Sequence, residues 1–125
     1  MKYFIDSNVF VYAKIGDRKY GECSQKVIKA IYEGQIKAIT DNVVLLEVAN
    51  ALRKLRISDV EEEILAILSL PIEIVEAKKE DILDAVKIQD LSPYDALHYI
   101  IAERHSAKVI TADKDFKERV DPCSL

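Results

Sequence analysis

The feature that most constrains the fold is the alternation of short apolar runs with longer stretches of helical periodicity. The apolar runs lie at 2–6, 36–40, 72–75 and 108–111, and each is long enough for one buried strand. Because parallel strands need crossover connections, which are usually helices, this order predicts a parallel sheet with helices on both faces. We therefore expect a three-layer α/β/α fold with a central parallel sheet of four or five strands.

Capping and stop signals indicate where the helices begin and end. Gly34 is expected to follow a helix as its left-handed C′ residue. Ser58 and Glu61 have the spacing of a capping box, and Ser92-Pro93 supplies an N-cap residue and a first-turn proline. The expected helices cover about 8–14, 24–33, 42–56, 58–69, 79–90 and 92–105, with a short helix from D-K-D-F at 113–116 and an edge strand near 121–124.

Length and composition fit one globular domain over residues 1–125. The chain is 50% hydrophobic and 32% charged, which is ordinary for a folded protein. No apolar run approaches the roughly 20 residues of a membrane span, and the first acid follows at position 6, so we expect a cytoplasmic protein without a signal peptide. Cys23 and Cys123 are far apart, and we expect two free thiols.

Acidic side chains stand where such a fold would gather them into one crevice. Asp6 and Asp113 follow the first and fourth apolar runs. Glu47 interrupts the apolar helix pattern V-V-L-L-E-V-A-N-A-L, and Asp95 lies in the first turn of the helix before the fourth run. In open parallel sheets, ligands bind beyond the carboxyl ends of the strands, where the strand order reverses. The acids meet there if the first and fourth strands are neighbours.

Each acid also has a purely structural interpretation. Asp95 could complete a capping box with Ser92, Asp113 could cap D-K-D-F, and Asp6 could be a turn residue. Glu47 could extend its carboxylate to the surface, but its apolar neighbours make this harder. Their coincidence in one crevice favours a cation site, and a site made only of carboxylates suits Mg²⁺ or Mn²⁺.

Two features limit the other kinds of site. Zinc would require clustered histidine or cysteine, and none is evident; His98, three residues after Asp95, is interpreted as a packed or hydrogen-bonded helix residue. The net charge of −4 argues against a nucleic-acid binder, yet without the four clustered acids the remaining charges balance. The basic residues that could form a modest RNA surface, or only a solvated face, are Lys14, Arg18, Lys19, Arg53, Lys54 and Arg56.

Several short motifs occur in a recognisable order: D-S-N at 6–8, Glu47 in a helix, Y-D-A-L-H at 94–98 and V-I-T-A-D-K-D-F at 109–116. Over its whole length the chain resembles the PIN domain and, by its size, the VapC-type toxin ribonucleases of that superfamily. The resemblance implies metal-dependent hydrolysis of RNA phosphodiester bonds, a homodimer and a cognate antitoxin protein.

By the same resemblance, the metal-binding catalytic acids are Asp6, Glu47, Asp95 and Asp113. Asn8 and Thr111 match polar positions that support the site through hydrogen bonds, and Asp115 matches a further, secondary acid. Bound Mg²⁺ or Mn²⁺ would activate a water for in-line attack and neutralise charge on the phosphodiester.

Two other functions stay open at this point. A receiver-like signalling domain also has an acidic Mg²⁺ pocket, but it needs an acceptor Asp after the third strand, where this chain reads I-E-I-V-E-A. A PIN-like fold could also be a non-catalytic binding module. A stripe in 57–70, made of Val60, Ile64, Ile67 and Leu68, could serve a dimer interface or the core.

Overall fold

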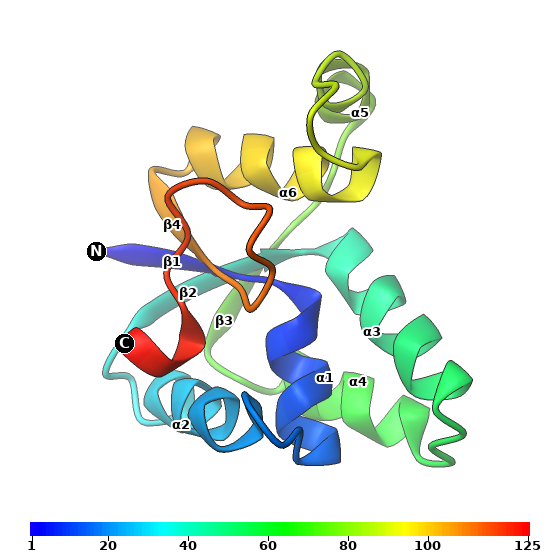
Figure 1. Cartoon of the computed structure of the whole chain (residues 1–125), viewed down its shortest axis with the longest axis vertical. Coiled ribbons are helices and arrows are strands. Elements are labelled where there is room, and N and C mark those ends of the chain that lie inside the picture. Colours follow the sequence, from blue (N-terminus) through cyan, green and yellow to red (C-terminus); the bar gives the residue numbers. More distant parts are fainter.

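The computed structural model covers all 125 residues and contains four strands, six α-helices and one 3₁₀ helix (Figure 1). In chain order these are β1 (Lys2–Ile5), α1 (Ser7–Ile15), α2 (Gly21–Tyr32), β2 (Lys37–Asp41), α3 (Asn42–Lys54), α4 (Val60–Leu68), β3 (Ile72–Val75), α5 (Lys79–Ala85), α6 (Pro93–Arg104), β4 (Ala107–Ile110) and η1 (Pro122–Ser124). No helix has the length and apolar character that a bilayer crossing requires.

The strands form one parallel sheet in the order β3-β2-β1-β4. Strand β1 lies between β2 and β4, so the strand order reverses where β1 meets β4. The expected parallel sheet and the expected neighbourhood of the first and fourth strands are both confirmed. The edge strand expected near 121–124 is wrong: Pro122–Ser124 is the 3₁₀ helix η1, and only Val120 adds a single parallel bridge to Ile110 at the β4 edge.

Helices cover both faces of the sheet, as Figure 1 shows: α1 to α4 lie on one side, and α5 and α6 on the other. The sheet is buried between them because its strands carry fully buried apolar side chains, including Phe4, Ile39 and Ile110. Val9 of α1 and Ile101 of α6 close the core from opposite faces. This three-layer arrangement brings the carboxyl ends of all four strands to one rim.

Some of the capping residues predicted from the sequence are confirmed and others are wrong. Gly34 follows α2 with a φ of +72°, and Ser92 caps α6, as expected. The Ser58 and Glu61 capping box is wrong, since α4 begins after Asp59 without a side-chain cap. The Asp59 carboxylate instead binds the ammonium group of Lys14 at 2.7 Å.

Helix α5 is shorter than expected, and the short helix expected from D-K-D-F is absent. Helix α5 ends at Ala85, where the Ile88 amide bonds back to the Ala85 carbonyl and tightens the chain into a turn. The segment from Asp113 forms turns and no helix, because the Asp113 carboxylate accepts from the Asp115 amide and Arg119 draws the chain back to the Thr111 carbonyl.

The apolar stripe of α4 serves mainly the core. Ile67 is buried, and Val60 and Ile64 pack against the same cluster. Leu68 is 49% exposed, as is its neighbour Leu65 at 56%. The stripe therefore leaves a pair of leucines on the outer side of the helix.

The expectation of free thiols is wrong: Cys23 and Cys123 form a disulfide, with their Cα atoms 4.9 Å apart. It links α2 to η1, which pack together at the base of the molecule. The cysteines are separated by 100 residues, so their proximity comes from the fold alone.

Replacing both cysteines with serine should lower the free energy of unfolding by about 2–4 kcal/mol, the usual contribution of a disulfide that closes a long loop. The measurement is denaturant unfolding of the oxidised wild type and of the Cys23→Ser, Cys123→Ser double variant. Dithiothreitol should weaken the wild type and leave the double variant unchanged. Equal sensitivity of both proteins to dithiothreitol would contradict the prediction.

Candidate functional site

Asp6 occupies the point where β1 passes into α1. Its carboxylate is 3% exposed, and its Oδ1 accepts from the Ser7 amide at 2.8 Å as the N-cap of α1. Its Oδ2 accepts from the Thr111 hydroxyl at 2.7 Å and from the Asn8 amide nitrogen at 3.3 Å. Burial raises the pKa of Asp6, and the charge of Glu47 adds to the rise, against the opposing effect of nearby donors. The acid is firmly oriented but poorly solvated.

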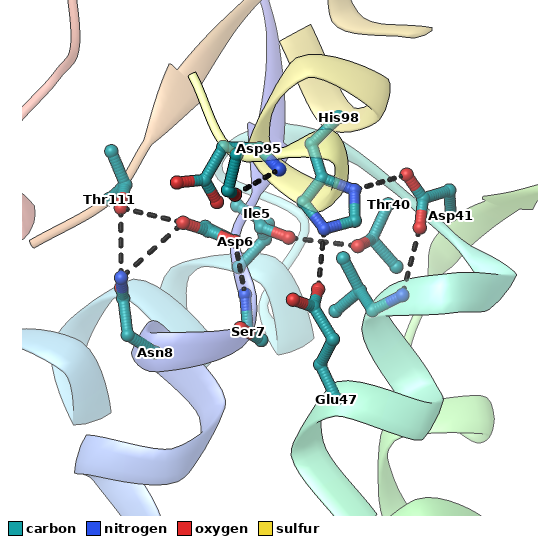
Figure 2. A network of polar contacts seen from close by, with 12 residues as sticks. Ile5, Asp6, Ser7, Asn8, Thr40, Asp41, Glu47, Asp95, His98 and Thr111 are labelled. Carbon is teal, nitrogen blue, oxygen red and sulfur yellow. Dashed lines mark hydrogen bonds and ion pairs between the residues drawn. The ribbon is translucent and has the colours of Figure 1, made fainter. Parts of the chain in front are cut away.

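Thr111 joins the carboxyl ends of β1 and β4 (Figure 2). Its hydroxyl donates to Asp6 and accepts from Asn8 Nδ2 at 2.9 Å and from the Asp113 amide at 3.0 Å. Asn8 completes the link, because its Oδ1 accepts from the Ala112 amide at 3.1 Å. The two polar residues predicted to support the site lie beside the first acid and bond to it.

Glu47 reaches the same crevice from α3, and its side chain is 25% exposed. Its Oε1 lies 2.5 Å from Nε2 of His98, whose ring is fully buried on α6. The other ring nitrogen, Nδ1, lies 2.6 Å from Oδ2 of Asp41, at the end of β2. The interpretation of His98 as a packed, hydrogen-bonded helix residue is confirmed.

The imidazole of His98 stands between two carboxylates, as Figure 2 shows. Burial by itself would lower the pKa of His98, but hydrogen bonds and charges from Asp41 and Glu47 outweigh it and raise the pKa to about 10. Since both partners are acceptors, the protonated ring donates from both nitrogens.

The charges of both Asp6 and Asp113 act on Asp95. The Asp95 backbone amide bonds to the Ser92 hydroxyl, which leaves the carboxylate free to face the crevice. Burial raises the pKa of Asp95 to about 6, with further contributions from the charges of Asp6 and Asp113. All four acids predicted for the site therefore interact, while Asp115 is exposed and gives only its amide to Asp113.

The most compact group of potential ligand atoms includes a histidine. One ligand atom each from Asp6, Glu47 and His98 can be chosen so that all lie within 4.8 Å of one another. The expectation that no histidine clusters at the site is therefore wrong. The sequence contains two indications of this arrangement. His98 shares a helix face with Asp95, and Asp41 lies at the end of a strand, much as Asp6 lies directly after one.

The donor set fits a hard divalent cation. Carboxylate oxygens supply most of it, and burial raises the pKa values of Asp6 and Asp95, with further contributions from the charges of neighbouring acids. A bound cation would compensate the negative charge of these acids.

The basic residues named for RNA binding differ in availability. Lys14 pairs with Asp59 and Glu63, at 2.7 and 3.5 Å, so it is committed to the fold. The others are exposed and form no ion pair: Arg18, Lys19, Arg53, Lys54 and Arg56.

Nearly the whole chain matches a known protein family. The sequence model of the PIN domain matches residues 3–121. Comparison with curated protein sequences gave no match. The fold is similar to that of VapC20 from Mycobacterium tuberculosis, a toxin that cleaves the sarcin–ricin loop, with a TM-score of 0.76, 15% identity and coverage of 90% of this chain and 91% of that one.

Two further solved structures are similar in fold. A toxin–antitoxin complex from Klebsiella pneumoniae gives a TM-score of 0.68 at 17% identity, over 98% of this chain and 99% of that one. VapBC2 from Rickettsia felis, bound to promoter DNA, gives 0.66 at 16% identity, over 90% and 89%.

Replacing Asp95 with asparagine should stabilise the metal-free protein increasingly as the pH rises. The folded state favours the neutral Asp95, so the stability linked to this group is complete below about pH 3.8 and is lost as the pH rises through about 6. Asparagine avoids that loss. The measurement is the melting temperature of both proteins in EDTA between pH 4 and 7.5. Asp90→Asn, which removes an exposed charge, is the control. A constant difference between Asp95→Asn and wild type would contradict the prediction.

Proposed function

The chain belongs to the PIN domain family, and on this premise we propose that it is an endoribonuclease that hydrolyses RNA phosphodiester bonds with Mg²⁺ or Mn²⁺. The observation that carries the proposal is the crevice in which Asp6, Glu47, Asp95 and Asp113 interact at the carboxyl rim of the sheet. Family membership removes the receiver-like alternative. A non-catalytic binding module stays the second candidate, and cleavage assays decide between them.

The four acids would hold the divalent cation, with Asp6 as the most rigidly oriented ligand. A bound ion lowers the pKa of its water and neutralises charge on the phosphodiester. Thr111 and Asn8 fix the Asp6 carboxylate, so this carboxylate needs little rearrangement to bind the cation. Asp95 interacts with the charges of both Asp6 and Asp113, and without a cation these acids would repel a phosphate.

RNA would approach along the exposed basic residues at the ends of α1 and α3. Arg53, Lys54 and Arg56 follow one another at the end of α3, the helix that carries Glu47. Arg18 lies in the turn after α1, the helix that Asp6 caps. These charges would attract the phosphate backbone and offset the repulsion from the acidic crevice.

We further propose that the protein is the toxin of a two-component pair, acts in the cytoplasm and is held inactive by an antitoxin protein. Support comes from the fold shared with a toxin from Mycobacterium tuberculosis and with toxin–antitoxin complexes from Klebsiella pneumoniae and Rickettsia felis. Co-expression with a candidate antitoxin should relieve growth arrest caused by the wild type. An Asp6→Asn variant should cause no arrest.

Purified protein should cleave labelled RNA in Mn²⁺, and EDTA should stop the reaction. Asp6→Asn and Asp95→Asn should each reduce the rate by about 100-fold or more, since a lost cation ligand removes several kcal/mol of transition-state stabilisation. Glu33→Gln, an exposed acid just before β2 at the opposite rim, should retain activity. Cleavage that survives thorough chelation would refute the mechanism.

We also propose a homodimer that uses the outer side of α4. Leu65 and Leu68 are 56% and 49% exposed and lie one helical turn apart. Two such leucines on each protomer would form a small apolar contact.

Light scattering at micromolar concentration should give twice the chain mass of 14.2 kDa. The Leu65→Lys, Leu68→Lys double variant should give a monomer, because a buried, unpaired lysine is costly at an interface. Val86→Lys, an exposed apolar position on the other helical layer, is the matched control and should remain a dimer. A monomeric wild type would exclude the dimer.

A further inference from the structure

Asp41 is a buried acid that helix capping does not fully explain. It ends β2 and is 0% exposed. One oxygen, Oδ1, accepts from the Val44 amide at 2.8 Å and caps α3. A serine could do that with far less cost of burial. The second oxygen, Oδ2, is 2.6 Å from Nδ1 of His98. The bond to Val44 therefore orients the carboxylate, and the second oxygen binds the His98 ring.

Packing and a hydrogen bond hold the ring of His98 in one orientation. It is 0% exposed and stacks on Phe4 of the central strand, with ring centres 5.5 Å apart and planes 30° from parallel. Asp41 holds its Nδ1, and the ring cannot rotate without breaking that bond or clashing with the core. Its Nε2 is therefore presented at a fixed point of the crevice.

Glu47 is the one member of the acid cluster that depends on this fixed point. Its flexible side chain comes from the middle of α3, and its only hydrogen bond in the protein is the 2.5 Å contact of Oε1 with His98 Nε2. Its Oε2 accepts no protein hydrogen bond. Asp6, by contrast, is held locally by Ser7 and Thr111.

We propose that Asp41 and His98 form a positioning relay, in which Asp41 fixes the His98 ring and His98 holds one oxygen of Glu47, so that the other oxygen faces Asp6 and is free for the cation. The inference rests on the proposed function and deepens it, because it assigns the orientation of one metal ligand to two residues outside the four-acid set. It also gives the imidazole a donor role. A ring that donates from Nε2 to a carboxylate has no lone pair there for a metal.

A pair of substitutions separates the two ends of the relay. In His98→Gln the amide nitrogen can reach the position of Nε2 and keep the bond to Glu47. In His98→Asn the shorter side chain can keep only the bond to Asp41. If positioning matters, Asn should weaken Mn²⁺ binding by about 10- to 100-fold, as losses of ligand-orienting partners do, and Gln should weaken it clearly less.

The readout is the Mn²⁺ dissociation constant, measured without RNA by the paramagnetic resonance signal of free Mn²⁺. Melting temperatures in EDTA identify any variant that fails to fold. A purely structural role for His98 would lower both melting temperatures without an Asn-to-Gln difference in Mn²⁺ affinity. Equal affinities for the two folded variants would overturn the relay.

A measurement on the wild type alone keeps the inference testable if both variants unfold. Electron spin echo spectroscopy of the Mn²⁺ complex detects a nitrogen bound directly to the metal. The relay predicts no such imidazole coupling, and a strong ¹⁴N coupling would make His98 a ligand and overturn the proposal. A wild type that binds no millimolar Mn²⁺ would instead remove the proposed metal-dependent function together with the relay. Normal binding and RNA cleavage in His98→Asn would remove the relay only.

Discussion

The hydrogen bond from the Thr111 hydroxyl to Asp6 is the contact on which the site depends. It ties the end of β1 to the end of β4, the two strands between which the strand order reverses. At that reversal the chains leaving the two strands diverge, and a crevice opens between them. A buried carboxylate there needs donors, and Thr111 and Asn8 supply them from opposite sides of the gap. The polar network therefore locks the two strands together and also orients the acid.

The negative charge of the crevice is only partly compensated by the protein. Toward α6 and β4, burial raises the pKa of Asp95 to about 6, and the charges of Asp6 and Asp113 add to the rise against the opposing charge of His98. Toward α3, Asp41 and Glu47 share the positive ring of His98. One positive ring cannot neutralise two carboxylates, so a cation entering the crevice meets excess negative charge on both sides. His98 compensates part of the negative charge of the crevice, and a bound cation would compensate the rest.

Much of this arrangement follows from the sequence, because the relevant signals are local. Apolar runs followed by Asp6 and Asp113 mark strand ends, and parallel topology then brings those ends to one rim. The Ser92-Pro93 start of α6 is equally local. Glu47 could be selected because its helix neighbours are apolar.

The features that sequence reasoning missed depend on contacts between distant segments. His98 bonds to acids from β2 and α3, at separations of 57 and 51 residues, and no local pattern encodes those pairings. Asp41 also ends a strand, but it reads as an ordinary cap for α3. The disulfide was missed because only the packing of α2 against η1 brings the cysteines together.

The disulfide divides the chain into a covalent ring and a short free arm. The ring runs from Cys23 to Cys123 and contains β2, β3 and β4 with Glu47, Asp95 and Asp113. The arm before Cys23 carries β1, the strand at the centre of the sheet, and Asp6. A backbone cut anywhere within the ring leaves both pieces joined, whereas after a cut in the turn at 16–20 only non-covalent contacts hold β1 and Asp6 in place. Asp6 is thus the one acid of the site that lies in a segment outside the covalent ring.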